Sequence, residues 1–441
     1  MAEIYPFRAL HYNLAAVGDL SKVTTQPYDK ISPEMQARYY EAHPANLVRL
    51  ILRRRGVTGN VYLEAAQTFQ NWISDRTLIS EPEPCLYPYT QDYEVPGRPG
   101  ERRRRWGFIA LLRLADYSQG VVHRHEETLS GPKADRLELL KATRANFGHI
   151  FMLYSDPAGE AEKALRQATA MPSWQQVTDE FGTVHRLGRV GDPAAIERVV
   201  EIMHGKKLVI ADGHHRYETS LTYAQQRKLE APQDDLAGYV MATFVPLESE
   251  GLLILPTHRV VHSLDHFDWN RFATATGAFF EWTPLEFDDL GAVEASKLQT
   301  ILETSGREGP SFIAFAGEDR FALLSLRHHA DLSPWLSDLP AGLRSLDAVL
   351  LHRLVLENLL GIDRQAVREQ KNLRYVREIE LAMEEVRRRR AQICFLMNPT
   401  PVTAVWENAL AGHVLPQKST DFYPKLLSGL TLYWMDNPSG M

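Results

Sequence analysis

The fold is decided by residues 208–218, which read Leu208-Val209-Ile210-Ala211-Asp212-Gly213-His214-His215-Arg216-Tyr217-Glu218. Four apolar residues in a row predict a short buried strand, and Gly213 marks its end. Residues 217–228 are helical in character. A strand that ends at a glycine just before a helix directs free backbone N–H groups toward one spot, where the helix dipole adds positive potential.

The polar side chains of this turn suit an anion. Gly213 allows a ligand to approach the backbone closely, because it has no side chain. His214, His215 and Arg216 supply donors of fixed geometry that match phosphate oxygens. The fold alone rarely requires four polar side chains directly after a buried strand. The sequence therefore favours a phosphate-binding turn, with Asp212 beside it. The alternative is an ordinary strand-to-helix turn whose histidines are internally satisfied.

Working outward, strands and helices alternate on both sides of the turn. Apolar periodicity predicts the following elements: helices at 134–146 and 193–204, and strands at 149–154, 207–211 and 238–246. Such alternation predicts an α/β fold whose helices pack on a mixed sheet. Four arginines, residues 102–105, come just before an expected strand at 106–112, and they are interpreted as a solvated edge.

Two domains are expected. Residues 1–265 would form a phosphate- or nucleotide-binding domain with an N-terminal helical extension, in which Ser32 caps a helix and residues 61–73 form another. Residues 266–441 would form a C-terminal α/β module, with a hairpin of two strands around residues 317–320 and an amphipathic helix at 343–360.

A second polar motif precedes the turn. Glu126 is a candidate general base and His125 a candidate catalytic neighbour, while Lys133 and Arg136 can neutralise phosphate charge. Residues 128–135 are expected to form a loop over a substrate. The alternative is a polar loop that leads into a helix.

Three weaker candidates lie near the two ends of the chain. Tyr28, Asp29 and Lys418 are candidate substrate-binding residues; the alternative is that each is an ordinary loop residue.

Composition excludes several classes. The chain has 441 residues and a net charge of −7, and this acidic balance disfavours a nucleic-acid-binding surface. Its apolar runs are much shorter than the roughly 20 residues of a membrane-spanning helix. The start of the chain lacks a signal-peptide pattern, and only Cys85 and Cys394 occur, so a cytoplasmic protein is expected. There is no P-loop, G-x-G-x-x-G or G-x-S-x-G motif. The oligomeric state is left open.

Several motifs resemble one family over nearly the full length. They are Phe7-Arg8-Ala9-Leu10, Pro27-Tyr28-Asp29, His125-Glu126, Lys133-Ala134-Asp135-Arg136, residues 211–217 and Leu415-Pro416-Gln417-Lys418-Ser419-Thr420. Together they are similar to the bacterial and archaeal domain-of-unknown-function 1015 family. More distantly, the turn resembles that of the ParB/sulfiredoxin-like fold, which includes free serine kinases.

The distant resemblance implies a role for each matching residue. In those kinases the turn holds nucleotide phosphates, and an earlier glutamate activates the substrate hydroxyl. Carried over, Gly213, His214, His215 and Arg216 would bind phosphate, and Glu126 would be the base.

Three functions remain open at this stage. The first is a small-molecule kinase that acts on a hydroxyl metabolite such as serine, using a nucleotide with Mg²⁺ and no protein-built metal site. The second is a phosphatase or metal-dependent hydrolase of a phosphorylated small molecule, with the histidines as metal ligands. The third is a non-enzymatic nucleotide-binding or DNA-associated module.

Overall fold

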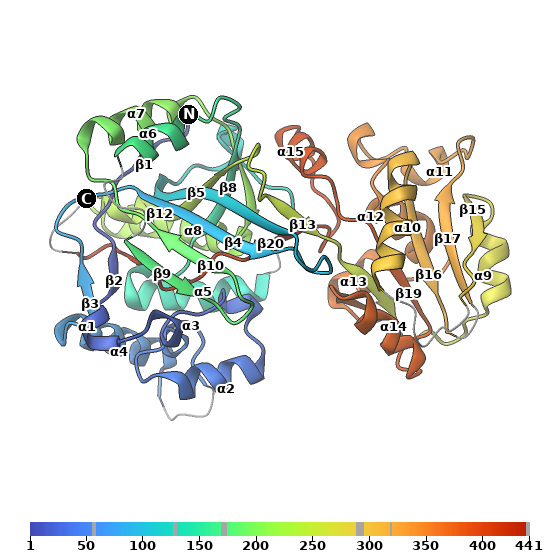
Figure 1. The fold of residues 1–441 in the computed structure, drawn as a ribbon, viewed down its shortest axis with the longest axis horizontal. Coiled ribbons are helices and arrows are strands. Elements are labelled where there is room, and N and C mark those ends of the chain that lie inside the picture. The colour runs from blue at the N-terminus through green and yellow to red at the C-terminus, as the bar shows by residue number, and fades with distance from the viewer. Residues whose placement is uncertain (55–58, 127–129, 169–173, 288–294, 318–319, 438–441) are drawn as a thin grey trace.

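The structure is a computed structural model, and it describes residues 1–54, 59–126, 130–168, 174–287, 295–317 and 320–437. Figure 1 shows two lobes side by side, each built around a sheet. The first sheet uses strands between residues 4 and 246, and the second uses strands between residues 258 and 397. The division into domains at residue 265 stays a prediction.

The first sheet has nine strands among the described residues, and their directions are mixed. Its order is β6 (Val122–His123), β11 (Leu208–Asp212), β8 (Ile150–Tyr154), β12 (Tyr239–Pro246), β5 (Arg102–Arg113), β4 (Tyr87–Glu94), β10 (Val184–Leu187) and β9 (Gln175–Thr178), with β1 (Ile4–Tyr5) paired to β5. β11 runs parallel to β6, and β12 runs parallel to β8, while the other pairs are antiparallel. The predicted α/β class with a mixed sheet is confirmed.

Helices cover both faces of this sheet (Figure 1). On one face, α6 (Glu160–Ala168) and α7 (Pro193–His204) bury apolar side chains against the strands. On the other face lie α4 (Val61–Ser74) and α5 (Ser130–Thr143), and α5 also packs along α8 (His214–Glu230). Short helices complete the N-terminal part: α1 (Leu14–Val17), η1 (Leu20–Lys22), η2 (Tyr28–Lys30), α2 (Pro33–Ala42) and α3 (Val48–Ile51).

Local sequence sets several helix starts as expected. The Ser32 hydroxyl accepts a hydrogen bond from Met35 N, and Pro33 occupies the first turn of α2. Asn60 caps α4 in the same manner. The predicted helix at 61–73 is therefore confirmed within one residue.

The second sheet is antiparallel throughout. Its order is β15 (Phe280–Pro284), β17 (Phe321–Leu326), β16 (Ser311–Phe315), β19 (Ile393–Met397), β14 (His258–Val261) and β18 (Leu373–Val376). The helical segments of this lobe are α9 (Trp269–Thr276), α10 (Ala295–Glu308), α11 (Ser333–Leu336), η6 (Ala341–Leu343), α12 (Asp347–Leu350), η7 (Leu351–Glu357), α13 (Arg364–Glu369), α14 (Ile379–Arg387) and α15 (Val402–Leu410). The predicted hairpin strands are present as β16 and β17; residues 318 and 319 between them lie outside the described part.

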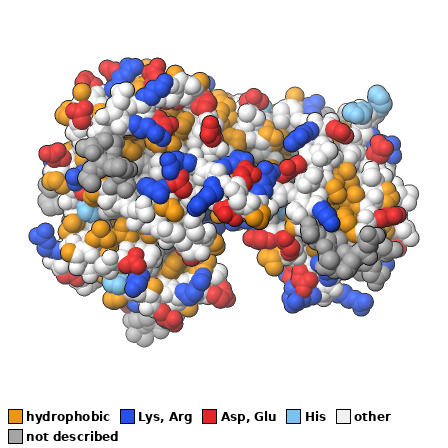
Figure 2. All heavy atoms as spheres, in the orientation of Figure 1, with side chains coloured by type: hydrophobic (Ala, Val, Ile, Leu, Met, Phe, Trp, Pro, Cys, Tyr) orange, Lys and Arg blue, Asp and Glu red, His pale blue; other side chains and the backbone are white. Residues whose placement is uncertain are grey.

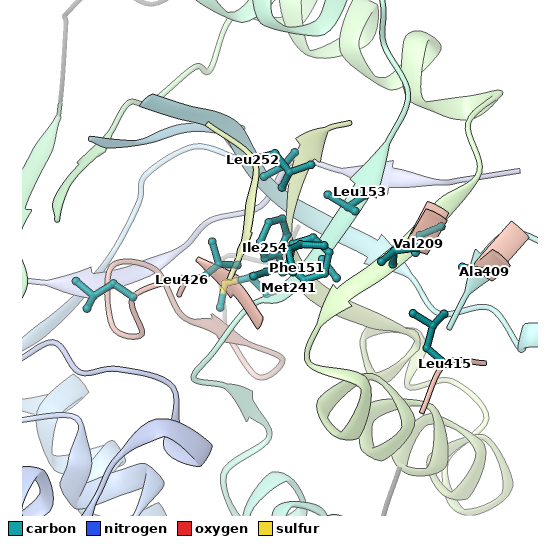
Figure 3. Close-up of a cluster of buried hydrophobic side chains, with 14 of the residues drawn as sticks. Phe151, Leu153, Val209, Met241, Leu252, Ile254, Ala409, Leu415 and Leu426 are labelled. Carbon is teal, nitrogen blue, oxygen red and sulfur yellow. The ribbon is translucent and has the colours of Figure 1, made fainter. Parts of the chain in front are cut away.

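The end of the chain returns to the first lobe. β20 (Asp421–Tyr423) pairs with β13 (Leu253–Leu255), and β21 (Tyr433–Trp434) pairs with β7 (Ala145–Asn146). Figure 3 shows Leu415 and Leu426 of this C-terminal segment in one apolar cluster with side chains of β8, β11 and β12. A further short pair joins β2 (Leu10–Tyr12) to β3 (Leu78–Ser80). The C-terminal segment is therefore fixed against the strand that leads into the turn.

Three local expectations are wrong, the first of them only in part. Residues 102–105 lie within β5 and pair with β4; Arg102 and Arg104 are exposed, as expected of a solvated edge, whereas Arg105 is only 1% exposed. Residues 130–135 belong to α5 rather than to a loop, while 127–129 lie outside the described residues. The expected continuous α-helix at 343–360 is instead a short α-helix followed by the π-helix η7, because apolar spacing over a few turns does not distinguish the two.

Across the described residues, no helix combines the length and apolar character needed to cross a bilayer. On the face shown in Figure 2, acidic and basic side chains are interspersed, and Lys and Arg side chains gather near the junction of the lobes.

Candidate functional site

The site is built on the turn between β11 and α8. Gly213 has φ +96°, a conformation that L-residues rarely adopt, and α8 begins at the next residue, earlier than predicted. Gly213 is the N-cap of this 17-residue helix, and it has no side chain that could accept a hydrogen bond from the first-turn N–H groups. A methyl group on Gly213 would lie 3.2 Å from Arg216 Nε. Glycine is therefore needed for the backbone and for the position of the guanidinium.

Arg216 is anchored inside the protein. Its Nη2 donates to Asp212 Oδ2 at 2.8 Å, and its Nη1 donates to the carbonyl of His149 at 2.6 Å. The side chain is 14% exposed. The Arg216 guanidinium is thus oriented by protein contacts, and part of it still borders a small cavity.

Three further cations, which the sequence did not single out, come close to this pair. Lys425 Nζ lies 3.6 Å from Asp212 Oδ1 and 3.1 Å from Asp421 Oδ1. Lys30 lies 3.7 Å from Asp421, and Arg377 of the second lobe donates to the same carboxylate at 2.7 Å. We call Lys30, Arg216, Arg377 and Lys425, with Asp212 and Asp421, the charged cluster.

Four cations thus surround two carboxylates, of which Asp421 is buried and Asp212 is partly buried. Burial by itself would raise the pKa of Asp212, but Lys425, Arg216 and Lys30 together hold it below its ordinary value. Burial would also raise the pKa of Asp421, but the charges of Lys425, Lys30 and Arg377 lower it. Both carboxylates are therefore ionised near neutral pH. The cations still outnumber them, so the charged cluster carries an excess of positive charge.

His125 and His214 lie together beneath the turn. Their ring centroids are 4.7 Å apart, and His214 Nε2 accepts a weak hydrogen bond from His125 N at 3.4 Å. The His125 ring contacts Ile210 O through Nδ1 and Thr420 Oγ1 through Nε2, at 2.7 and 2.8 Å. Burial lowers the pKa of both imidazoles, so both are neutral near pH 7. His125 is thus fixed by the protein at both ring nitrogens.

Glu126 lies beside the C-terminal segment. Its Oε1 accepts a hydrogen bond from Lys418 N at 2.8 Å, and its backbone forms a bridge with Leu415. The negative charge of Glu126 opposes the lowering of the His215 pKa, and it contributes to the raised pKa of Tyr375 in the second lobe. The predicted base is therefore brought to the start of α8 and to the junction of the two lobes.

The other predicted residues surround the turn. The guanidinium of Arg136 lies 4.3 Å from the centroid of the Tyr28 ring and donates to Ile51 O at 2.6 Å. Lys133 forms an ion pair with Glu218 at 2.5 Å.

The remaining candidates lie at the edge of the charged cluster. Asp29 and Lys418 are exposed. His215 is partly exposed in the first turn of α8, and burial lowers its pKa. All the predicted site residues are thus gathered around the end of β11.

A cavity of about 80 Å³ adjoins the charged cluster. It is lined by Tyr28, Arg136, Gly148, Arg216 and Ser428 among others. Its polar lining combines the predicted site residues Tyr28, Arg136 and Arg216 with other side chains: Asn146, Thr219, Ser220 and Ser428.

Within the described part of the chain, no group of three or more His, Cys, Asp or Glu side chains is placed to hold a metal ion. Asp212 and Asp421, which carry the oxygen ligands that Mg²⁺ prefers, already face cations. These residues do not fit a protein-built magnesium site.

The structure is thus a mixed α/β protein with a charged cluster at the end of a buried strand. Residues 4–349 match the family described as a protein of unknown function, DUF1015, and the chain belongs to this family. No curated protein matches.

Three solved structures are weakly similar to this chain. A conserved hypothetical protein from Pyrococcus furiosus is 12% identical, with a TM-score of 0.34, over 71% of this chain and 92% of the other. A free serine kinase in complex with AMP is 14% identical, with a TM-score of 0.33, over 70% and 89%. SbnI with a C-terminal truncation from Staphylococcus aureus is 10% identical, with a TM-score of 0.31, over 70% and 82%. The assignment to a ParB/sulfiredoxin-like core stays a prediction.

Proposed function

We propose that this protein is a small-molecule kinase. The charged cluster binds the phosphates of a nucleotide, and a phosphoryl group passes to a hydroxyl group of a small acceptor such as serine. The observation that carries this proposal is the convergence of Lys30, Arg216 and Lys425 on Asp212 and Asp421, at the end of β11. Phosphoryl transfer depends mainly on positioning and on neutralising charge, and this corner supplies both.

Each side chain has a role in this scheme. Arg216 and Lys425 neutralise the phosphates, with His215 and the first-turn N–H groups of α8 as additional donors. Lys133 and Arg136 line the path by which the nucleotide reaches the charged cluster. Glu126 accepts the proton of the acceptor's hydroxyl group while the hydroxyl oxygen attacks the terminal phosphorus of the nucleotide. The bond to the bridging oxygen breaks, and the nucleotide leaves one phosphate shorter. Mg²⁺ is expected to accompany the nucleotide through its phosphate oxygens, and no step is assigned to it.

Both cysteines, Cys85 and Cys394, are buried and unpaired. Reduced cysteines support a reducing compartment, and we propose that the kinase acts in the cytoplasm.

Glu126→Gln tests the chemical role directly. The amide oxygen of glutamine can still accept from Lys418 N, so the loop stays anchored, whereas the base is lost. Nucleotide affinity should stay unchanged, while turnover should fall by about 10²–10⁴-fold. The assay is phosphate transfer to a panel of hydroxyl metabolites, beginning with serine, and His123→Gln on the neighbouring strand is the control.

Other outcomes separate the alternatives. Phosphate release without an acceptor would favour a hydrolase, for which the described residues offer no metal-ligand group. Nucleotide binding without any turnover would favour a binding module. Unchanged turnover in Glu126→Gln would remove Glu126 as the base.

A further inference from the structure

A larger cavity, of about 470 Å³, lies between the second lobe and residues 414–417 of the C-terminal segment. Its volume falls within the range of about 300–1,000 Å³ that is common for small-molecule sites. Apolar side chains form much of its wall: Leu339, Leu343, Val349, Val367, Val414 and Leu415. These walls suit a ligand with an apolar body of modest size.

Two polar atoms at this cavity lack partners. His352 lines it and is only 5% exposed, yet no group hydrogen-bonds to its Nε2 within the described residues. Gln417 also lines it, and its buried Oε1 has no donor in the same part of the chain. A buried polar atom without a partner costs about 1–3 kcal/mol, so a group that fills the cavity is expected to satisfy these two.

The backbone geometry places His352 at this cavity. It lies in the π-helix η7, a rare conformation that occurs frequently at functional sites. Burial lowers the pKa of His352 to about 3, so its imidazole is neutral near pH 7 and can accept or donate a hydrogen bond. A buried neutral imidazole fits a hydroxyl or carboxyl partner.

Arginines give the cavity a positive side. Arg353 pairs with Asp338 and Glu357, and Arg364 lies 3.6 and 3.5 Å from the same two carboxylates. Arg368 is exposed and has no ion pair among the described residues. Arg353 and Arg364 therefore share two carboxylates, and the charge of Arg368 is available for a ligand.

We propose that this cavity is a binding site for a small organic acid that has an apolar body and a hydroxyl group. The carboxylate lies toward Arg368, the hydroxyl donates to Gln417 Oε1 and accepts from His352 Nε2, and the apolar body contacts the walls. The site is separate from the charged cluster and does not rest on the proposed kinase activity.

Mandelate is the first probe, because it combines a ring, a hydroxyl group and a carboxylate. Phenylacetate lacks the hydroxyl, and phenylethanediol lacks the carboxylate. Calorimetric titration of the full chain should show saturable binding of one mandelate per chain and weaker binding of the other two. No saturable binding of mandelate would overturn the proposal.

Two variants assign the contacts. Gln417→Leu should reduce the preference for mandelate over phenylacetate to about one, because the hydroxyl loses its acceptor. Arg368→Gln should weaken both acids about two- to fivefold and leave phenylethanediol unchanged. Arg388→Gln, at the exposed residue that follows α14, is the matched control. Equal effects of Arg368→Gln and Arg388→Gln would contradict the proposed position of the carboxylate.

Discussion

Lys425 Nζ lies 3.6 Å from Oδ1 of Asp212, although the two residues belong to distant parts of the sequence. Lys425 is 8% exposed, and burial would lower its pKa, but Asp212 and Asp421 raise it. The C-terminal segment thus places a buried, charged lysine at the end of β11. This contact joins the two parts of the chain that the proposed phosphate site requires.

Gly213→Ala should disturb the turn in two ways. The positive φ strains any other residue by about 1–2 kcal/mol, and the new methyl group would press on Arg216. Gly182→Ala is the matched control, because Gly182 has φ +78° and no heavy atom within 4 Å of a Cβ. Urea unfolding should show a loss of stability in both variants, while calorimetry should show weaker ATP binding in Gly213→Ala alone. Equal ATP binding in the two variants would contradict the role of the glycine.

Arg105→Ala should destabilise the protein by about 2–4 kcal/mol. The guanidinium of Arg105 donates to Tyr423 O at 3.1 Å and to the side chain of Gln91, and it stacks on Phe151. Its loss would leave these buried acceptors without a donor. Arg102→Ala, on the exposed start of the same strand, should change stability by less than about 0.5 kcal/mol. The free energies of unfolding in urea test this difference; similar values for both variants would support the solvated-edge interpretation instead.

Acid should weaken the fold through buried neutral histidines. Burial and the nearby Arg216 lower the pKa of His149 from 6.5 to about 3. The folded pKa lies below the unfolded one, so the stabilising contribution is complete above pH 6.5 and is lost as the pH falls toward 3.

The free energy of unfolding changes with pH in proportion to the number of protons taken up on unfolding. His149→Gln should therefore reduce this slope between pH 4 and 6 by the amount that corresponds to about one proton. Urea unfolding at several pH values measures this slope, and the exposed His204→Gln is the control. A slope identical to that of the unmutated chain would show that His149 does not contribute.

Local chemistry made the central part of the fold predictable. Apolar residues 208–211 and Gly213 define a strand and its end within a single window, and Ser32 is a recognisable helix cap. His125, Glu126 and Arg216 could be proposed as neighbours because the family motifs connect them. The predicted residues do gather at one place, whereas their roles stay predictions.

The partners of Asp212 could not be found in the same way. Lys30 and Lys425 are ordinary lysines in the sequence, and only the tertiary fold brings them to the turn. Arg105 looked like an exposed charge, because a run of arginines does not reveal which member faces the core. His352 was hidden for another reason: an apolar helical pattern does not reveal a π-helix.

The most direct test of the account is calorimetric titration with ATP and Mg²⁺ of the natural chain, Lys425→Met and Lys425→Arg. The natural chain should bind ATP, Lys425→Met should bind at least about tenfold more weakly, and Lys425→Arg should retain most of the affinity, because the charge is preserved. Lys141→Met, at an exposed pair on α5, should bind as the natural chain does. Absence of ATP binding in the natural chain, or equal affinities in Lys425→Met and Lys141→Met, would contradict a phosphate site at the charged cluster.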